Sequence, residues 1–180
     1  MKAIYYEEYG NISVLKQGEI DDPKKVLDKE VLIKVNFFSL NPLDYKLRNG
    51  MLKLMTFRTF PRTTGSDFSG EIIAKGDSVN NFEIGEKVFG FLSQLNEGTS
   101  SQFIKVNESI LSKAPSNIDI GAAAAVPLAA LTSYQALVQL AKIKKGNKVL
   151  INGASGGTGI FAIQIAKIFG AKVTSITSHR

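Results

Sequence analysis

The chain has no cysteine and only one histidine, His179, among its 180 residues. It can therefore form neither disulfides nor thiolate zinc sites. Long hydrophobic runs are also missing, because the most apolar stretch, residues 121–131, is far shorter than the ~18 residues needed to span a bilayer. Acidic residues follow the first few positions too closely to leave room for a signal-peptide core. We expect a cytoplasmic protein without a membrane partner.

Clusters of basic residues are absent too, although the net charge is +6. Nucleic-acid-binding proteins usually gather their lysine and arginine residues on one face or helix. No block of five or more basic residues occurs here, so the lysines predict a solvated basic surface and no nucleic-acid partner. An excess of basic over acidic residues also suits an anionic ligand such as a dinucleotide phosphate.

The first two thirds of the chain have the residue pattern of short β-strands. In "EVLIKVNFF", the apolar residues Val31, Ile33, Val35 and Phe37 alternate and are expected on one face. Further short apolar runs, such as "GEIIAKG", "EKVFGF" and "SQFIKV", are bounded by turn-forming residues. We predict an all-β barrel or sandwich over residues 1–120.

The remainder, residues 121–180, is richer in helix-forming residues and then reads strand, helix, strand. The helix "IFAIQIAKIF" has only Gln164 and Lys167 as polar positions, three residues apart, which predicts a helix buried nearly all round. Gly170 is expected to end it. Two strands joined by a helix predict a parallel pair, the start of a doubly wound α/β sheet.

A glycine-rich turn between the first of these strands and the helix carries the strongest chemical signal. Ala154, Gly156 and Gly159 occupy the frame of the dinucleotide-binding fingerprint. Gly156 would let the backbone approach a pyrophosphate, and Gly159 would let the helix pack closely on the strand. The helix N-terminus offers N–H groups and a partial positive charge to the phosphates. A tight turn without a ligand is the alternative. The predicted cofactor-binding residues of the turn are Gly153, Ala154, Ser155, Gly156, Gly157 and Thr158.

A second frame, with Gly153, Gly157 and Gly159, fits the pattern of the short-chain reductases. That family opens its chain with the turn and continues to a Tyr-x-x-x-Lys catalytic pair. Here a β-rich region precedes the turn, and no room for the pair remains after it. We therefore set the short-chain pattern aside.

The end of the second strand indicates which dinucleotide is bound. An NAD site has an acidic residue there for the ribose 2′-hydroxyl. No Asp or Glu occurs from Gly146 onward, and Ser178 and Arg180 stand at this position instead. A hydroxyl and a guanidinium suit a 2′-phosphate, which a carboxylate would repel. The sequence predicts NADP(H) as the cofactor.

Five segments in order resemble the medium-chain dehydrogenase/reductase superfamily, specifically its zinc-independent quinone oxidoreductase branch. They cover nearly the whole chain: "NPLDYKLRNG", "TGSDFSGEIIAKG", "FEIGEKVFGF", "AAAAVPLAALTSYQAL" and "GNKVLINGASGGTGIFAIQIAKIFGAKV". The resemblance implies a GroES-like β-barrel domain (1–120) followed by a partial Rossmann domain (121–180), with the active site between them. It also implies hydride transfer from NADPH to quinones or other conjugated carbonyls.

Zinc is not expected, because the superfamily's alcohol dehydrogenases bind it through cysteine and histidine. This chain lacks cysteine, and its one histidine, His179, lies in the nucleotide loop. Hydrogen-bond donors can polarise a substrate carbonyl in place of a metal.

The family places its active-site loop at "NPLDYKLRNG". The resemblance implies that Asn41 bonds the nicotinamide ribose or the substrate carbonyl, and that Tyr45 and Lys46 donate to a developing oxyanion. The same residues also describe a capped helix with Asn41 at the N-cap, and we assign Asp44 to that cap. A capped helix can still direct side chains into an active site, so both interpretations stay open.

Two further positions follow from the resemblance. Thr132 is expected near the nicotinamide, unless its hydroxyl turns back onto its own helix. Asp67 in "GSDFSG" is expected to cap or bridge strands rather than to take part in chemistry.

Three functions remain: an NADPH-dependent reductase of quinones or conjugated carbonyls, an enoyl-thioester reductase of the same superfamily, and a non-enzymatic nucleotide-binding or interaction protein. A complete dinucleotide domain has six strands, and only two are present here. We therefore expect an N-terminal portion of a longer reductase, weakly active or inactive alone. Its exposed α/β stub is expected to form homo-oligomers or other associations.

Overall fold

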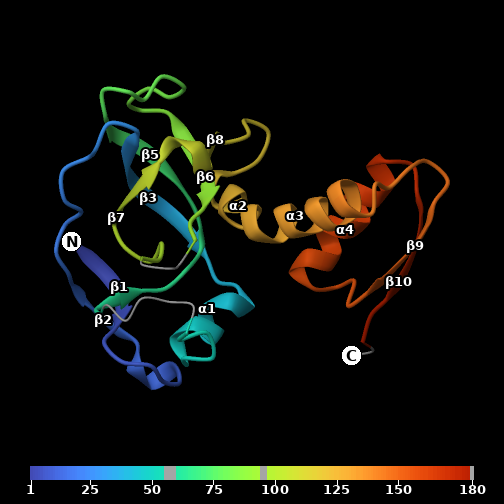
Figure 1. Ribbon diagram of the computed structural model, residues 1–180, viewed down its shortest axis with the longest axis horizontal. Helices are drawn as coiled ribbons and strands as arrows, with labels where there is room; N and C mark the ends of the chain where they lie inside the picture. The colour runs from blue at the N-terminus through green and yellow to red at the C-terminus, as the bar shows by residue number, and fades with distance from the viewer. Residues whose placement is uncertain (55–59, 94–96, 179–180) are drawn as a thin grey trace. The chain divides into compact units, whose positions relative to one another are not determined.

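The computed structural model describes residues 1–54, 60–93 and 97–178 and divides the chain into two compact units, Met1–Ala125 and Val126–Arg180 (Figure 1). The division predicted at residue 120 falls at the start of helix α2 (Ile120–Ala124), which belongs to the first unit. Each unit is described by itself below.

The first unit contains two antiparallel sheets. The larger has the order β7-β3-β5-β6-β8, and the smaller has the order β2-β1-β4. A short helix, α1 (Pro42–Arg48), leaves the end of β3, and single 3₁₀ turns occur at Ile12–Val14 and Glu108–Ile110. The strands are β1 (Lys2–Tyr6), β2 (Lys16–Glu19), β3 (Glu30–Ser39), β4 (Arg62–Thr63), β5 (Asp67–Lys75), β6 (Lys87–Phe91), β7 (Phe103–Asn107) and β8 (Leu111–Lys113).

The core of this unit lies against the five-stranded sheet. Val31 and Ile33 of β3 are fully buried, as the alternating pattern predicts, and they belong to one cluster with Phe68 of β5. The prediction is wrong for Phe37, which is 48% exposed. An extra residue in β3 shifts the register between Val35 and Phe37. Such a bulge reverses the alternation of side chains beyond it, so Phe37 leaves the core face.

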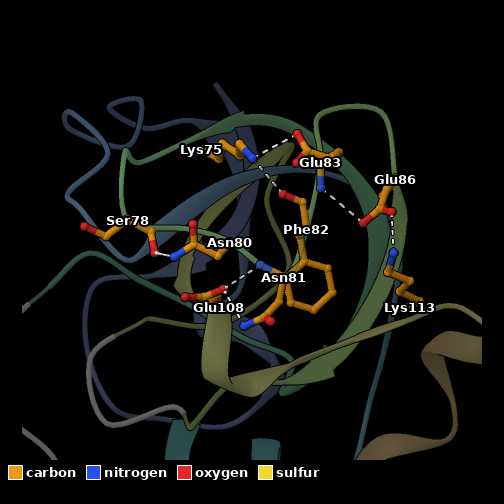
Figure 2. Close-up of polar contacts among 9 residues, drawn as sticks. All are labelled: Lys75, Ser78, Asn80, Asn81, Phe82, Glu83, Glu86, Glu108 and Lys113. Atoms are coloured by element: carbon orange, nitrogen blue, oxygen red, sulfur yellow. Dashed lines mark hydrogen bonds and ion pairs between the residues drawn. The ribbon is translucent and has the colours of Figure 1, made fainter.

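Polar contacts hold the loop between β5 and β6 in place, as Figure 2 shows. Lys75 donates to the carbonyl oxygen of Phe82 (3.0 Å) and pairs with the Glu83 carboxylate (2.9 Å). The Glu86 carboxylate accepts from the Glu83 N–H (3.1 Å) and from the Lys113 ammonium of β8 (2.5 Å). These contacts fix the loop from both sides while the Phe82 ring stays buried in the core.

The Glu86–Lys113 pair predicts a pH-dependent contribution to stability. The hydrogen bond from Lys113 lowers the pKa of Glu86 below its ordinary value of 4.5. A lowered pKa stabilises the fold above that value, and the gain is lost as the pH falls through the folded-state pKa. Lys113→Met should lower the melting temperature slightly at pH 7, since exposed pairs contribute little. The difference from wild type should shrink when the pH is lowered well below 4.5, where the Glu86 carboxylate becomes protonated.

Thermal unfolding at both pH values measures this effect, with Lys87→Met as the control. Lys87 is exposed on the neighbouring strand β6, and its replacement changes the net charge equally. A difference between Lys113→Met and wild type that is the same at both pH values would contradict the assignment.

The second unit is a parallel β-α-β unit with an additional helix. Its helix α3 (Pro127–Tyr134) continues as a π-helical segment, η3 (Gln135–Leu140). Strand β9 (Lys148–Asn152), helix α4 (Gly157–Ile168) and strand β10 (Lys172–Ile176) follow. The two strands pair in parallel, with Lys148 opposite Lys172 and Asn152 opposite Ile176. The predicted architecture, a β domain followed by the first β-α-β unit of a doubly wound sheet, is thus confirmed.

The predicted burial of α4 on nearly all sides is wrong within the described structure. Its buried residues are Gly159, Ala162 and Ala166, all on one face. Ile160 is 49% exposed and Ile168 is 80% exposed. The described sheet of this unit has two strands, so it covers one side of the helix only. Association through the uncovered side stays a prediction.

Candidate functional site

The glycine turn joins β9 to α4 through a tight, locally bonded backbone. Gly153 has a φ of +72°, a conformation that side chains rarely allow, and its carbonyl accepts from the N–H of Gly156 (3.0 Å). Ala154 is buried, and its N–H donates to the carbonyl of Ile176 at the end of β10 (3.0 Å). The turn is therefore fastened to the carboxyl end of the neighbouring strand.

Gly159 is the position where close packing requires glycine. A Cβ atom there would lie 2.6 Å from the carbonyl oxygen of Gly153 and 2.7 Å from the Cα of Ala154. These atoms belong to the backbone and cannot move aside like a flexible side chain. The third position of the fingerprint thus has the geometry that dinucleotide-binding turns need.

The exposed part of the turn presents backbone N–H groups at the N-terminus of α4. Gly156 is the N-cap residue, no side chain caps the helix in the described structure, and the first intrahelical bond runs from Ile160 to Gly156 (3.0 Å). The N–H groups of Gly157, Thr158 and Gly159 precede that bond and have no partner within the helix. Ser155, Gly156, Gly157 and Thr158 are all exposed. The chain's own residues therefore fit a pyrophosphate, for which a helix N-terminus is a ready site.

Helix α3 lies beside this turn within the second unit. The buried Ser133 hydroxyl lies 2.9 Å from the carbonyl oxygen of Ala129 and 2.7 Å from that of Thr158, to which it donates, and so links the two helices. The Thr132 hydroxyl donates to the carbonyl of Leu128 (2.7 Å), the alternative considered from the sequence. Thr132 is exposed, so the lone pairs of its hydroxyl oxygen remain accessible to a ligand as acceptors. Ser133 was not predicted from the sequence, where its only distinguishing feature is that it directly follows Thr132.

The predicted 2′-phosphate residues, Ser178 and Arg180, follow β10 in the sequence. Ser178 is exposed two residues beyond the end of the strand. Arg180 lies outside the described residues.

The second group of candidates surrounds the start of α1 in the first unit. The backbone N–H of Asn41 donates to the Asp44 carboxylate, and the N–H of Asp44 returns to the carbonyl of Asn41 (2.9 Å). Asn41 as N-cap and Asp44 as a cap residue are thus confirmed. The other Asp44 oxygen accepts from the buried Ser66 hydroxyl (3.0 Å), which ties the helix to the residues before β5.

The Asn41 amide is held by a buried carboxylate. Its Nδ2 donates to Asp67 Oδ2 (2.9 Å) and lies 3.4 Å from the Ser39 hydroxyl, which itself donates to Asp67 Oδ2 (3.0 Å). Asp67 is fully buried, and it faces Ser39 in the β3–β5 register. An ionised carboxylate only accepts hydrogen bonds, so Asn41 must turn its NH₂ group toward Asp67. The Asn41 side chain also accepts within the capping box at the start of α1, so the second lone pair of Oδ1 is what a ligand could use.

Tyr45 and Lys46 lie on the first turns of the same helix. Tyr45 is 46% exposed and Lys46 is partly exposed. Neither side chain makes a hydrogen bond to another residue in the described parts of the chain. Both are therefore donors available to a ligand. The sequence alone does not specify which strands pair. It therefore could not show the contacts of Ser39 and Ser66 or the bridge from Asp67 to Asn41.

Within residues 1–54, 60–93 and 97–178, no group of three His, Asp or Glu side chains is placed to hold a metal ion. None of the helices described there combines the length and apolar character needed to cross a bilayer.

Comparison with known proteins shows which family the chain belongs to. Residues 27–124, more than half of the chain, match the model of the alcohol dehydrogenase GroES-like domain. The chain is 37% identical to a chloroplastic quinone-oxidoreductase homolog of Spinacia oleracea, over 100% of this chain and 56% of that protein. It spans about half the length of the curated relatives it matches.

Solved structures agree with this match. The Escherichia coli quinone oxidoreductase in complex with NADPH has a TM-score of 0.85 and 25% identity, covering 99% of this chain and 53% of that one. The enoyl reductase CurK has a TM-score of 0.89 and 32% identity, covering 98% of this chain and 54% of that one. The chain therefore belongs to the alcohol dehydrogenase GroES-like family of the medium-chain dehydrogenase/reductase superfamily, and the quinone oxidoreductases named above are among the proteins that it resembles.

Proposed function

We propose that this chain supplies the GroES-like domain and the pyrophosphate turn of an NADPH-dependent reductase of quinones or other conjugated carbonyls. The observation that carries the proposal is the glycine turn, where Gly159 is packed against backbone and the α4 N-terminus is open. It occurs in a chain whose relatives along its whole length include quinone-oxidoreductase homologs. The chain spans about half of those relatives, so it is proposed to be weakly active or inactive alone.

The second unit would hold the cofactor, which supplies a hydride when bound. The N–H groups of Gly157 and Thr158 would bind the pyrophosphate. Ser178 and Arg180 would bind the 2′-phosphate. Thr132 already uses its proton on Leu128, so it would act toward the nicotinamide as an acceptor.

In the first unit, the orientation of Asn41 supports one of the two roles that the sequence left open. Its NH₂ group is directed at Asp67, so Asn41 Oδ1 would accept a hydrogen bond from a nicotinamide ribose hydroxyl. Donation from Asn41 to a substrate carbonyl would require breaking that contact with the buried carboxylate. Tyr45 and Lys46 keep their donors available and would stabilise negative charge developing on a carbonyl oxygen, with a proton delivered from one of them.

Two other functions remain as alternatives. An enoyl-thioester reductase is favoured by the likeness to CurK, described as an enoyl reductase. A non-enzymatic nucleotide-binding or interaction protein would keep the turn without the chemistry. A cytoplasmic location and homo-oligomer formation also remain parts of the proposal.

The deciding experiment measures NADPH oxidation with quinones, enones and enoyl thioesters. It should be run on this chain and on the full-length protein that contains it. The proposal predicts turnover of quinones or enones by the full-length protein and little by the chain alone. Preference for enoyl thioesters would favour the first alternative. Intact NADPH binding without any turnover by the full-length protein would favour the second.

Cofactor choice gives a separate prediction. NADPH should bind more tightly than NADH, because a serine and an arginine stand where NAD sites have an acid. Arg180→Ala should weaken NADPH binding by about 1.5–3 kcal/mol, the range for a hydrogen bond to a charged group. It should leave NADH binding unchanged, since NADH has no 2′-phosphate. Calorimetric titration of both cofactors measures this, and equal affinities in wild type would refute it.

Zinc independence is the next prediction, and it rests on the absence of cysteine. Elemental analysis of the purified protein should find no stoichiometric zinc, and a chelator should leave the melting temperature unchanged. The control is the same protein dialysed against zinc before analysis. One tightly bound equivalent that resists the chelator would contradict the prediction.

A further inference from the structure

The second unit gathers its lysines at one end of its sheet. The N–H of Gly146 donates to the carbonyl of Gly170 (2.9 Å), and the N–H of Lys172 donates to the carbonyl of Asn147 (2.7 Å). The segment before β9 and the turn between α4 and β10 therefore lie side by side, at the end of the sheet away from the C-terminus (Figure 1). We name the lysines of these segments and of the adjoining ends of β9, α4 and β10 the basic edge: Lys142, Lys144, Lys145, Lys148, Lys167 and Lys172.

The charge of this end is not balanced within its own unit. All 16 acidic residues of the chain precede residue 126, so the second unit contains none. Its basic residues are the six lysines of the basic edge and Arg180. All six of those lysines are exposed. Exposed surfaces usually intersperse both signs, whereas one sign alone creates a field that attracts an anionic partner.

Large apolar side chains are exposed among these lysines. Leu140 is 81% exposed, two residues before Lys142. Ile168 is 80% exposed and Phe169 is 36% exposed, and they are the next two residues after Lys167. Lysines with exposed aliphatic and aromatic side chains between them are typical of surfaces that lie on anionic membranes. Nucleic-acid surfaces rely more on arginine, which is absent from this end.

The basic edge is distinct from the nucleotide site. The glycine turn follows the carboxyl end of β9, whereas the basic edge lies where both parallel strands begin. A pyrophosphate at the turn therefore leaves the lysines free. The sequence alone led us to expect no membrane partner. From this surface we propose instead that the basic edge binds the surface of a membrane rich in anionic lipids, with the ammonium groups at the headgroups and Leu140, Ile168 and Phe169 at the acyl boundary.

Vesicle flotation tests this proposal on the purified chain. Vesicles of phosphatidylcholine with one third phosphatidylserine should carry the chain upward, and vesicles of phosphatidylcholine alone should not. Binding should fall steeply at about 0.5 M salt, where screening shortens the reach of the lysine charges. The chain spun without vesicles controls for aggregation. Equal flotation with neutral vesicles would overturn the proposal.

Charge reversal locates the binding surface. Lys144→Glu with Lys145→Glu should weaken anionic-vesicle binding by about tenfold or more, because each lysine near the surface contributes measurably to binding. Lys24→Glu with Lys25→Glu is the matched control, an exposed pair in the first unit with the same change of charge. Circular dichroism confirms that both variants fold.

Two results would overturn the assignment. Equal losses in the two double variants would show that net charge alone drives binding. A short RNA duplex that binds more tightly than the vesicles, and is released by the same Lys144 and Lys145 changes, would show that the partner is a nucleic acid. Ile168→Ser should weaken vesicle binding while leaving its salt dependence intact. If Ile168→Ser binds vesicles as tightly as wild type, the apolar part of the proposal is wrong.

Discussion

Replacing Gly159 with alanine should destabilise the second unit by about 3 kcal/mol, at the upper end of the range for overpacking. The added Cβ would lie 2.6 Å from the carbonyl oxygen of Gly153 and 2.7 Å from the Cα of Ala154. Both atoms belong to a turn that is bonded to the end of β10 through Ala154. The clash can be relieved only by moving α4 away from β9, which exposes the packing between them.

The matched control is Gly157→Ala in the first turn of the same helix. A Cβ at Gly157 would meet nothing nearer than the Ala129 side chain at 3.9 Å. This change should leave stability within about 0.5 kcal/mol, or raise it, because alanine restricts the unfolded chain. Hydrogen exchange of residues 148–176 measures both variants. Equal protection in Gly159→Ala and Gly157→Ala would contradict the close packing described for the turn.

Replacing Asp67 with alanine should destabilise the first unit by about 3 kcal/mol, because it removes a buried charged acceptor and leaves donors unpaired. The Asn41 amide and the Ser39 hydroxyl both donate to Asp67 Oδ2. Without the carboxylate, the Asn41 amide is no longer held in one orientation. The variant should therefore disturb the start of α1 as well as the sheet.

Ser69→Ala on the same strand is the control for Asp67→Ala. Ser69 is also fully buried, but its hydroxyl makes one bond to a neutral partner, the carbonyl of Ile120 (2.6 Å). Its loss should cost about 1 kcal/mol. Urea unfolding followed by tyrosine fluorescence reports mainly on the first unit, because Tyr134 is the only tyrosine outside it. Similar losses for the two variants would show that Asp67 does not organise the site.

The parts of the fold that depend on neighbouring residues could be predicted from the sequence. Alternation in β3 marked Val31 and Ile33 as core, and both are fully buried. Glycine at 170 ends α4 with a φ of +72°, as a residue after a helix should. The strand–turn–helix context identified the glycine turn for the same reason, since all of its parts lie within one short segment.

Features that depend on distant contacts could not be predicted. The bulge after Val35 depends on pairing with β5, so Phe37 was wrongly placed in the core. The exposure of Ile168 depends on how many strands cover α4, which periodicity does not show. Ser39 and Asp67 meet only through the β3–β5 register, so the orientation of Asn41 had no signal in the sequence. The basic edge was hidden because its lysines come from two separate segments.

The most direct test of the central claim is an NMR titration of the ¹⁵N-labelled chain with NADPH. The claim is that the exposed N–H groups at the start of α4 bind the cofactor's pyrophosphate. The largest amide shifts should therefore fall on residues 153–159, and Gly159→Ala should abolish them. Saturating shifts confined to other residues, or no shifts in a folded chain at millimolar NADPH, would contradict the claim.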